Sequence, residues 1–148
     1  MTTVAEILKS KPSAQIHSVA PTDTVLTALR LMSDKGIGAL LVMQGEQIAG
    51  IFTERDYARK VVLLGRSSGD TPISEVMTRA VRFVHPDQTA EQCMALMTDH
   101  RLRHLPVIDA ENGGLVGLVS IGDLVKSVIS AQQFIIEQME QYITGSHR

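Results

Sequence analysis

The fold is decided by a stretch of seven residues, Gly50-Ile51-Phe52-Thr53-Glu54-Arg55-Asp56, which returns in altered form as Gly117-Leu118-Val119-Ser120-Ile121-Gly122-Asp123. In both copies a glycine and two apolar residues lead to a hydroxyl residue, and an aspartate follows three positions later. The apolar pair is typical of the end of a buried strand, and the residues after each aspartate, 57–62 and 124–129, are predicted to form a helix. Each copy therefore predicts a turn from a strand into a helix.

Two interpretations of this turn are open. A hydroxyl at the start of a helix caps free backbone N–H groups, and the carboxylate one turn later can accept hydrogen bonds from the diol of a sugar. Thr53 with Asp56, and Ser120 with Asp123, would then form two binding turns. The same spacing is also an ordinary capping box, which only starts a helix. A single copy favours the capping box, whereas the repetition favours a binding role.

The turns belong to a longer internal repeat. Residues of four kinds recur 65 positions apart, in the pairs Pro21/Pro86, Thr24/Thr89, Asp34/Asp99 and Val42/Val107. The glycines and aspartates of the turns, Gly50/Gly117 and Asp56/Asp123, lie 67 apart, so two residues are added in the second hairpin. A constant offset across different residue types indicates two copies of one structural unit.

Each copy is predicted to be a β-α-β-β-α unit that begins with a short apolar lead-in. The lead-ins are residues 4–12, of which 4–8 form the apolar part, and residues 73–79. The predicted strands are 16–19 and 81–84, 39–43 and 105–108, and the two strands that end in the turns. Thr24 and Thr89 mark the starts of one-sided helices, and Gly36 ends the first of them. We expect a mixed α/β (α+β) fold, with the two repeats packed in pseudo-twofold symmetry and an extra C-terminal helix.

The predicted boundaries follow the repeat. They are 4–64 for the first repeat, 65–72 for a linker, 73–129 for the second repeat and 130–144 for the C-terminal helix. The linker contains Gly65-Arg66-Ser67-Ser68-Gly69-Asp70, a run of turn-forming residues. This run lacks the Lys-Ser/Thr ending of a phosphate-binding Walker loop, so we interpret it as a connection between the repeats.

Composition limits the function classes. The chain has 148 residues, of which 44% are hydrophobic, and a formal net charge of −2. That is enough apolar material for a core, and the scattered basic residues give no electrostatic footprint for nucleic acid or an anionic membrane. Residues 1–6 show no signal-peptide pattern, and no apolar stretch approaches the roughly 20 residues that span a bilayer. We expect a soluble, cytoplasmic protein with no nucleic-acid or membrane partner.

The sequence does not indicate an enzyme. The histidines show no metal-ligand spacing; they are His17, His85, His100, His104 and His147. Cys93 lies on the apolar side of a predicted helix, as a buried thiol does, and it has no local signature of a nucleophile. Arg55 stands between Glu54 and Asp56, and its charge keeps carboxylates ionised rather than poised as acids. We expect neither catalytic residues nor a metal site.

The order of these elements resembles a tandem pair of CBS domains, the module named after cystathionine β-synthase and also called a Bateman module, in its stand-alone, bacterial-type form. The resemblance rests on the Gly-x-x-Ser/Thr-x-x-Asp turn in each copy, on Val76-Met77-Thr78 and on Arg103-His104-Leu105-Pro106-Val107. It covers about residues 4–129. It implies a regulatory module that binds an adenosyl ligand, such as AMP, ATP, NAD(H) or S-adenosylmethionine, in clefts between the two units. It also implies that the occupancy is passed on to a partner protein.

By this resemblance the aspartates bind ribose hydroxyls, and the hydroxyl residues help to hold ribose or phosphate. The first cleft would combine Thr53, Arg55, Asp56, Thr78, Arg103 and His104 as nucleotide-binding residues, and the second would combine Ser10, Ser120 and Asp123, with Lys9 or Lys11 nearby. Arginine offers bidentate donors to phosphate, whereas Gly38 and Ala39 stand in the second cleft where Arg103 and His104 stand in the first. We therefore expect phosphorylated ligands to prefer the first cleft. Without the repeat, Arg103 and His104 would be interpreted as a solvated turn between a helix and a strand.

Residues 130–144 are predicted to form an additional helix after the second repeat. The apolar stripe that leads into this helix and runs along it comprises Val125, Val128, Gln132, Ile135, Met139 and Tyr142, flanked by Ile129, Ile136 and Ile143. A stripe this wide on a terminal helix needs a partner surface, which is either a second copy of the chain or the protein's own core. We expect a homodimer. The polar residues 145–148 are expected to fray.

Together these observations predict a sensor of adenine nucleotides that regulates an unidentified protein. The alternative, from another class, is an interaction or dimerisation scaffold whose clefts bind no ligand. Ligand-dependent stabilisation of the fold separates the two, because only a molecule that binds the native state raises its stability by mass action.

Overall fold

The structure is a computed structural model that describes residues 2–12 and 15–144. Packing divides the chain into two compact units. The Asp56 unit consists of Gln15–Arg82, and the Asp123 unit combines the described residues before Gln15 with the chain from Phe83 on. The expectation for residues 145–148 lies outside the described residues.

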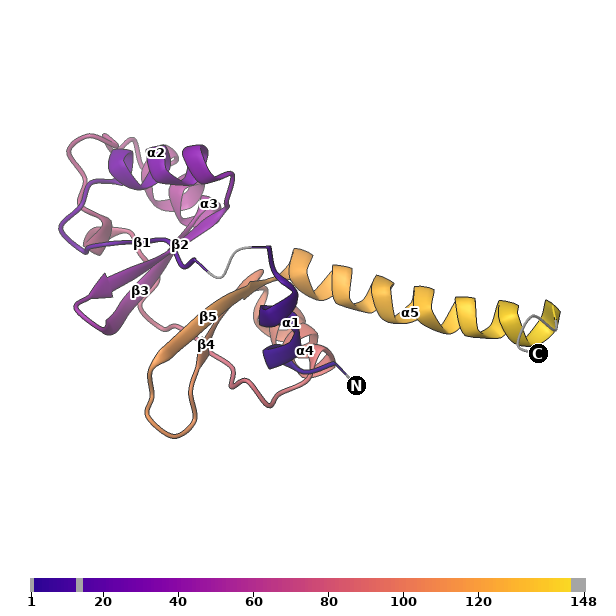
Figure 1. Cartoon of the computed structure of the whole chain (residues 1–148). Helices are drawn as coiled ribbons and strands as arrows, with labels where there is room; N and C mark the ends of the chain where they lie inside the picture. Colours follow the sequence, from indigo (N-terminus) through magenta and orange to yellow (C-terminus); the bar gives the residue numbers. More distant parts are fainter. Residues whose placement is uncertain (1, 13–14, 145–148) are drawn as a thin grey trace. The chain divides into compact units, whose positions relative to one another are not determined.

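In the Asp56 unit, helix α2 (Val25–Lys35) packs on a sheet of three strands (Figure 1). The strands, in spatial order, are β1 (Ser18–Val19), β2 (Ala39–Gln44) and β3 (Gln47–Thr53). β1 runs parallel to β2, and β2 runs antiparallel to β3. The Thr24 hydroxyl caps α2 by accepting from the N–H of Thr27, and Gly36 ends the helix in the left-handed conformation with φ of 64°. Both helix ends are as the sequence predicts.

Three short helical segments complete the Asp56 unit. They are α3 (Glu54–Asp56), the π-helix η1 (Tyr57–Val62) and the 3₁₀-helix η2 (Ile73–Glu75). The predicted helix after Asp56 is therefore a π-helix, in which the N–H of Leu63 donates to the carbonyl of Ala58 at 3.0 Å. The core of the unit includes Val25, Leu40, Phe52, Val61 and Ile73.

The Asp123 unit is built from three helices and a two-stranded sheet (Figure 1). Its elements are α1 (Val4–Ser10), α4 (Ala90–His100), β4 (His104–Ile108), β5 (Leu115–Ser120) and α5 (Ile121–Thr144). Thr89 and Gln92 form the predicted capping box of α4. The predicted strand 81–84 is reduced to one parallel bridge between Val84 and Val107. In that bridge the carbonyl of Pro106 accepts from the N–H of Val84 at 3.0 Å, and the carbonyl of Val84 accepts from the N–H of Ile108 at 2.8 Å.

Each lead-in begins one repeat and packs on the other. In the Asp123 unit the carbonyl of Gln88, just before α4, accepts from the N–H of Val4 at 2.8 Å. In the Asp56 unit the carbonyl of Asp23, just before α2, accepts from the N–H of Ile73 at 2.8 Å. The two compact units are therefore not the two contiguous repeats. The predicted boundaries 4–64, 65–72, 73–129 and 130–144 follow the repeats and stay a prediction.

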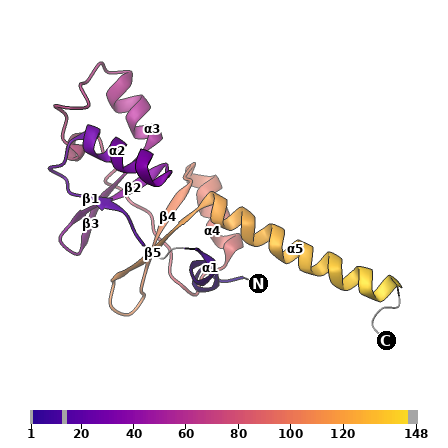
Figure 2. The ribbon, with the colours of Figure 1, turned by 45° about the horizontal axis from the view of Figure 1, so that its top comes forward.

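The last helix is longer than the sequence predicts. The helix expected after Asp123 and the additional helix 130–144 form one continuous helix, α5, of 24 residues. In both views α5 extends beyond α1, α4 and β5 of its own unit (Figures 1 and 2). The mixed α/β class, the two small sheets and the C-terminal helix are confirmed. The pseudo-twofold packing of the repeats stays a prediction.

The glycine of each turn motif allows a lead-in to lie against the strand. A Cβ on Gly50 would stand 2.7 Å from the carbonyl oxygen of Thr78 and 2.9 Å from the sulfur of Met77. Thr78 exchanges two backbone hydrogen bonds with Ile51, of 2.8 and 2.9 Å, so this carbonyl is fixed. A Cβ on Gly117 would instead meet the end of the Leu8 side chain at 2.8 Å.

Gly50→Ala is therefore expected to destabilise the protein more than Gly117→Ala. The first methyl group collides with hydrogen-bonded backbone, an overpacking that typically costs about 1–3 kcal/mol. The second collides with a flexible side chain that can rotate away. Urea denaturation of the two variants measures the difference, and equal shifts in the midpoint would contradict this account of the motif.

Candidate functional site

The turn of the Asp56 unit is a capping box. Thr53 ends β3, and its hydroxyl oxygen accepts from the N–H of Asp56 at 3.2 Å. In return, carboxylate oxygen Oδ2 of Asp56 accepts from the N–H of Thr53 at 3.0 Å and from its hydroxyl at 3.1 Å. The carboxylate is therefore held in one orientation by the end of the strand.

The second oxygen of Asp56 is also engaged. Oδ1 accepts from the hydroxyl of Thr78 at 2.9 Å and lies 3.1 Å from the ammonium nitrogen of Lys60. Asp56 is only 5% exposed, so its charge is balanced inside the unit rather than by water. A sugar diol that binds at Oδ1 must replace the hydroxyl of Thr78 or the ammonium of Lys60.

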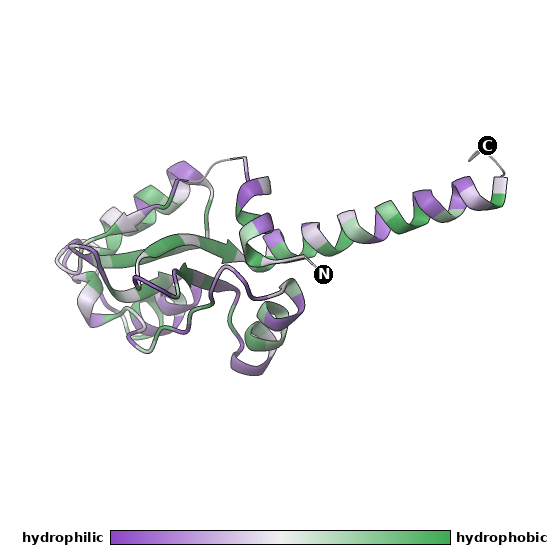
Figure 3. Cartoon of the chain, turned by 60° about the horizontal axis from the view of Figure 1, so that its bottom comes forward, coloured by the Kyte–Doolittle hydropathy of each residue, from purple (hydrophilic) through white to green (hydrophobic). Residues whose placement is uncertain are grey.

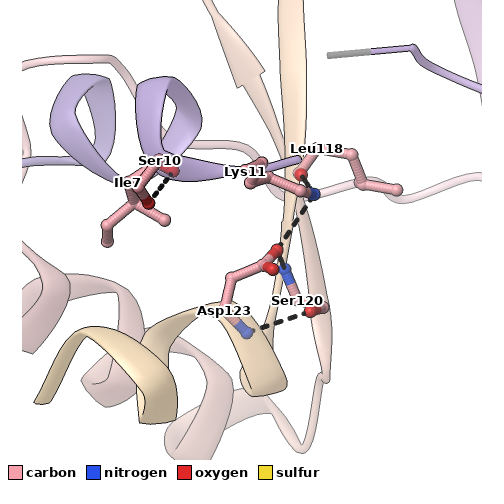
Figure 4. A network of polar contacts seen from close by, with 6 residues as sticks. All are labelled: Ile7, Ser10, Lys11, Leu118, Ser120 and Asp123. Carbon is pink, nitrogen blue, oxygen red and sulfur yellow. Dashed lines mark hydrogen bonds and ion pairs between the residues drawn. The ribbon is translucent and has the colours of Figure 1, made fainter. Parts of the chain in front are cut away.

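The turn of the Asp123 unit repeats this geometry with a different lead-in residue (Figure 4). Oδ2 of Asp123 accepts from the N–H of Ser120 at 2.9 Å, and the hydroxyl of Ser120 accepts from the N–H of Asp123 at 3.2 Å. The ammonium of Lys11 lies 3.0 Å from Oδ2 of Asp123 and donates to the carbonyl of Leu118 at 2.8 Å. Lys11 thus holds Asp123 as Thr78 holds Asp56.

The electrostatics of Asp123 favour the ionised carboxylate. Burial alone would raise its pKa, but the N–H of Ser120 and the ammonium of Lys11 donate hydrogen bonds to it, and Lys11 adds its positive charge. The pKa of Asp123 therefore lies below its ordinary value. A carboxylate with a lowered pKa remains an acceptor at neutral pH, as a diol ligand requires.

A pocket of about 530 Å³ opens beside Asp123 between α1 and α5. Its polar lining includes Ser10, Lys11, Asp123, Lys126 and Ser127. This volume lies within the range of small-molecule sites. The predicted site residue Ser10 lines the pocket, but its hydroxyl donates to the carbonyl of Ile7 at 2.8 Å (Figure 4).

The structure brings together only part of each predicted cleft. Thr53, Asp56 and Thr78 meet in the Asp56 unit, and Arg55 is exposed on α3 of that unit. Arg103 and His104 belong to the Asp123 unit, where Arg103 is exposed and His104 begins β4. Their convergence on Asp56 stays a prediction.

The alignment of Arg103 with Gly38 has a structural counterpart. The carbonyl of Gly38 accepts from the N–H of Glu54 at 3.1 Å, and the carbonyl of Arg103 accepts from the N–H of Ile121 at 2.8 Å. In each unit this bond joins the start of one strand to the first helical residue after the turn. Gly38 and Arg103 therefore occupy equivalent backbone positions, and their side chains distinguish the two repeats.

Two lysines at these turns were not among the predicted site residues. Lys60 follows Asp56 by four positions, which is the spacing of an ion pair on one helix face, so its position carried a signal. Lys11 was expected only near the second cleft, because nothing in its spacing shows that α1 packs against β5. Lys11 reaches Asp123 only because the lead-in of the first repeat packs on the second repeat.

Two kinds of reactive group were considered in the sequence, the Cys93 thiol and clusters of metal ligands. Burial raises the pKa of the Cys93 thiol, and the charge of Glu91 raises it further, so the thiolate is disfavoured. No group of three or more His, Cys, Asp or Glu side chains between residues 2–12 and 15–144 is arranged to hold a metal ion. Over the same ranges, no helix combines the length and apolarity needed to cross a bilayer.

A family model described as CBS domain matches residues 4–63 and again residues 73–130. The chain belongs to the CBS domain family. It is similar to a protein with CBS domains from Burkholderia ambifaria MC40-6, whose structure has been solved. The two sequences are 61% identical and the two structures superpose with a TM-score of 0.85, over 88% of this chain and 96% of that chain. The CBS domain-containing protein CBSX3, mitochondrial, of Arabidopsis thaliana is 39% identical over 99% of this chain and 74% of its own length.

The same fold occurs in CBSX2, solved in complex with AMP. Its TM-score is 0.71 and its sequence identity is 24%, with 89% of this chain and 99% of that chain covered. At this identity the likeness is one of fold. The family assignment makes this chain a pair of regulatory domains.

Lys11→Met is expected to lower the stability of the protein at neutral pH more than in acid. The folded-state pKa of Asp123 is lowered, so its contribution to stability is present above the unfolded pKa of about 4 and is lost as the pH falls through the folded pKa. Removing Lys11 removes part of that contribution. Urea midpoints near pH 7 and about pH 3 test this, and the gap between the variant and the natural protein should narrow in acid.

Lys9→Met is the matched control, since Lys9 lies in the last turn of α1 and Lys11 is the C-cap of the same helix. It removes the same charge without breaking the ion pair to Asp123. If both variants show the same pH dependence, the effect belongs to net charge and not to the contact between Lys11 and Asp123.

Proposed function

We propose that this CBS-domain pair is a sensor that binds an adenine nucleotide or another adenosyl compound at its two turns and transmits the occupancy to a partner protein. The observation that carries the proposal is the repeated turn, in which Asp56 and Asp123 are each held by the end of a strand and by a lead-in. The fold shared with CBSX2 supports it at the level of architecture. No catalytic role is assigned.

The proposed recognition is an exchange of hydrogen-bond partners. The two hydroxyls of a ribose donate to the carboxylate and replace the Thr78 hydroxyl at Asp56, or the Lys11 ammonium at Asp123. Such charge-assisted bonds are stronger than those between neutral groups. Because each displaced group lies in a lead-in, the ligand alters the contact between a lead-in and the repeat on which it packs. In this way ligand binding at a turn changes the surface that the module presents to a partner protein.

A thermal-shift panel with AMP, ATP, NAD(H), S-adenosylmethionine and adenosine tests the proposal. A sensor should be stabilised saturably by at least one of these compounds, because binding to the native state raises stability by mass action. A scaffold without a ligand should respond to none of them. The cytoplasmic location and the identity of the regulated protein stay predictions from the sequence.

Asp56→Ala is expected to weaken AMP binding by about ten- to a hundredfold, since it removes charge-assisted hydrogen bonds worth about 1.5–3 kcal/mol. Asp123→Ala should weaken it much less, because the sequence assigns phosphorylated ligands to the cleft of Asp56. Titration calorimetry decides the matter, with urea midpoints to verify that each variant is folded. Loss of binding in Asp123→Ala alone would reverse the assignment. Unchanged binding in both variants would remove the nucleotide proposal.

Arg103→Ala is expected to weaken AMP and ATP while leaving adenosine binding unchanged. The guanidinium is proposed to bind phosphate oxygens and not ribose, so its loss should be seen only with phosphorylated ligands. Arg103→Lys retains the charge but not the bidentate geometry. Its affinity for AMP should therefore lie between that of the natural protein and that of Arg103→Ala. An equal loss for adenosine and AMP in calorimetry would show that Arg103 acts on the fold and not on phosphate.

A further inference from the structure

The connection between β4 and β5, residues 109–114, is a polar stretch between two largely apolar strands (Figure 3). Every residue from 110 to 114 is exposed, and the connection extends away from the helices of its own unit (Figures 1 and 2). It contains Asn112, the only asparagine of the chain, followed directly by Gly113. An asparagine side chain before glycine is open to attack by the next backbone nitrogen, because glycine has no side chain that shields this nitrogen.

The structure holds the Asn112 amide against its own backbone. Its oxygen Oδ1 accepts from the N–H of Gly114 at 2.7 Å. This bond polarises the amide carbonyl, and it stabilises the negative charge that gathers on Oδ1 when a nucleophile adds to Cγ, as an oxyanion hole does. Gly113, which supplies the nucleophilic nitrogen, has a φ of 72°, a conformation that glycine adopts without strain. The fold of the loop therefore activates the carbonyl carbon.

One contact opposes the attack. The N–H of Gly113 donates to the carbonyl of Asp109 at 2.9 Å, and this bond must open before the nitrogen can lose its proton. A single hydrogen bond contributes little net stability, and bonds in exposed loops open by local fluctuation. We expect this contact to slow the reaction by about two- to tenfold and not to block it.

We propose that Asn112 is a site of spontaneous covalent modification in the folded protein, with water as the co-reactant. A base of the solvent takes the proton of the Gly113 N–H, and the nitrogen forms a bond to Cγ of Asn112. The bond between Cγ and Nδ2 breaks, and Nδ2 leaves as ammonia with a proton from the solvent. Water then opens the five-membered succinimide ring at either carbonyl, which gives an aspartate or an isoaspartate. No atom is oxidised or reduced.

The first repeat offers a natural comparison. Its hairpin carries Gln44-Gly45, and Gly45 has a similar φ of 65°. Glutamine is longer by one methylene, so the same attack would close a six-membered ring, which forms more slowly. The reactive pair, Asn112-Gly113, therefore lies in the hairpin that the two extra residues of the second repeat lengthen.

The modification changes the loop in two ways. Either product adds one negative charge beside Asp109 and Glu111, in a chain whose formal net charge is −2. Isoaspartate also adds a methylene to the backbone, because the chain then continues through the former side chain. The added length falls between Asp109 and Gly114, where the N–H of Asp109 donates to the carbonyl of Gly114 at 2.8 Å. This site is separate from the two turns and does not depend on ligand binding.

Mass spectrometry of the folded chain, kept for weeks in warm neutral buffer, tests the proposal. The natural chain should gain about one dalton, since OH replaces NH2, and the gain should map to the peptide that contains Asn112. Asn112→Gln copies the residue of the first repeat and is the matched control, which should keep its mass. A methyltransferase specific for isoaspartate should label the natural chain and not this variant.

Asp109→Ala tests the restraint that the loop imposes. Oδ1 of Asp109 accepts from the N–H groups of Glu111 and Asn112 at 2.8 and 3.2 Å. Its loss loosens the contacts that keep the Gly113 N–H on the Asp109 carbonyl. This variant should be modified about two- to tenfold faster than the natural chain, and so approach the rate of the chain unfolded in guanidinium chloride.

Three results would overturn the proposal. The first is a natural folded chain that keeps its mass, whether or not the unfolded chain gains a dalton. The second is an equally fast gain in Asn112→Gln, which would place the reaction at another residue. The third is an unchanged rate in Asp109→Ala together with a much faster rate in the unfolded chain, which would show that the loop contacts do not control the reaction.

Discussion

Both units depend on one interaction, the contact between the carboxylate of a turn and the lead-in that packs beside it. Asp56 and Asp123 each orient the first turn of a helix by accepting from a strand-end N–H, and each is held a second time by Thr78 or Lys11. Because a buried carboxylate without partners would be strongly destabilising, these contacts fix the lead-ins in place. The glycine that precedes each turn gives the lead-in the space to do so.

The two repeats use this interaction in different ways. Thr78 supplies a neutral donor, and the positive charge at Asp56 comes from Lys60 in the helix that follows. At Asp123 a single residue, Lys11, supplies both the donor and the charge. The helix after Asp56 widens into a π-helix, a feature often found at functional sites, whereas α5 continues as a regular α-helix. The two turns therefore share one backbone arrangement but differ in the groups that contact the carboxylate.

Local rules made much of the fold predictable from the sequence. Caps at Thr24 and Thr89 and the left-handed Gly36 depend on neighbouring residues alone, and the constant offset identified the repeat. The strand expected at 81–84 is reduced to a bridge, since sheet pairing depends on partners distant in sequence. The contact of Lys11 with Asp123 was equally hidden, because it arises only when a lead-in packs on the other repeat. Spacing reveals residues that share an element, and it says little about contacts between elements.

Each lead-in packs on the other repeat, and this arrangement determines what the displacement of a lead-in contact would affect. If each repeat packed only on its own lead-in, displacing that contact would affect one repeat. Here Thr78, which contacts Asp56, lies in the lead-in of the second repeat, and Lys11, which contacts Asp123, lies in the lead-in of the first. Any group that displaces Thr78 or Lys11 therefore acts on the connection between the repeats. Since α5 begins directly at the Asp123 turn, displacement of Lys11 in particular acts at the first turn of this helix.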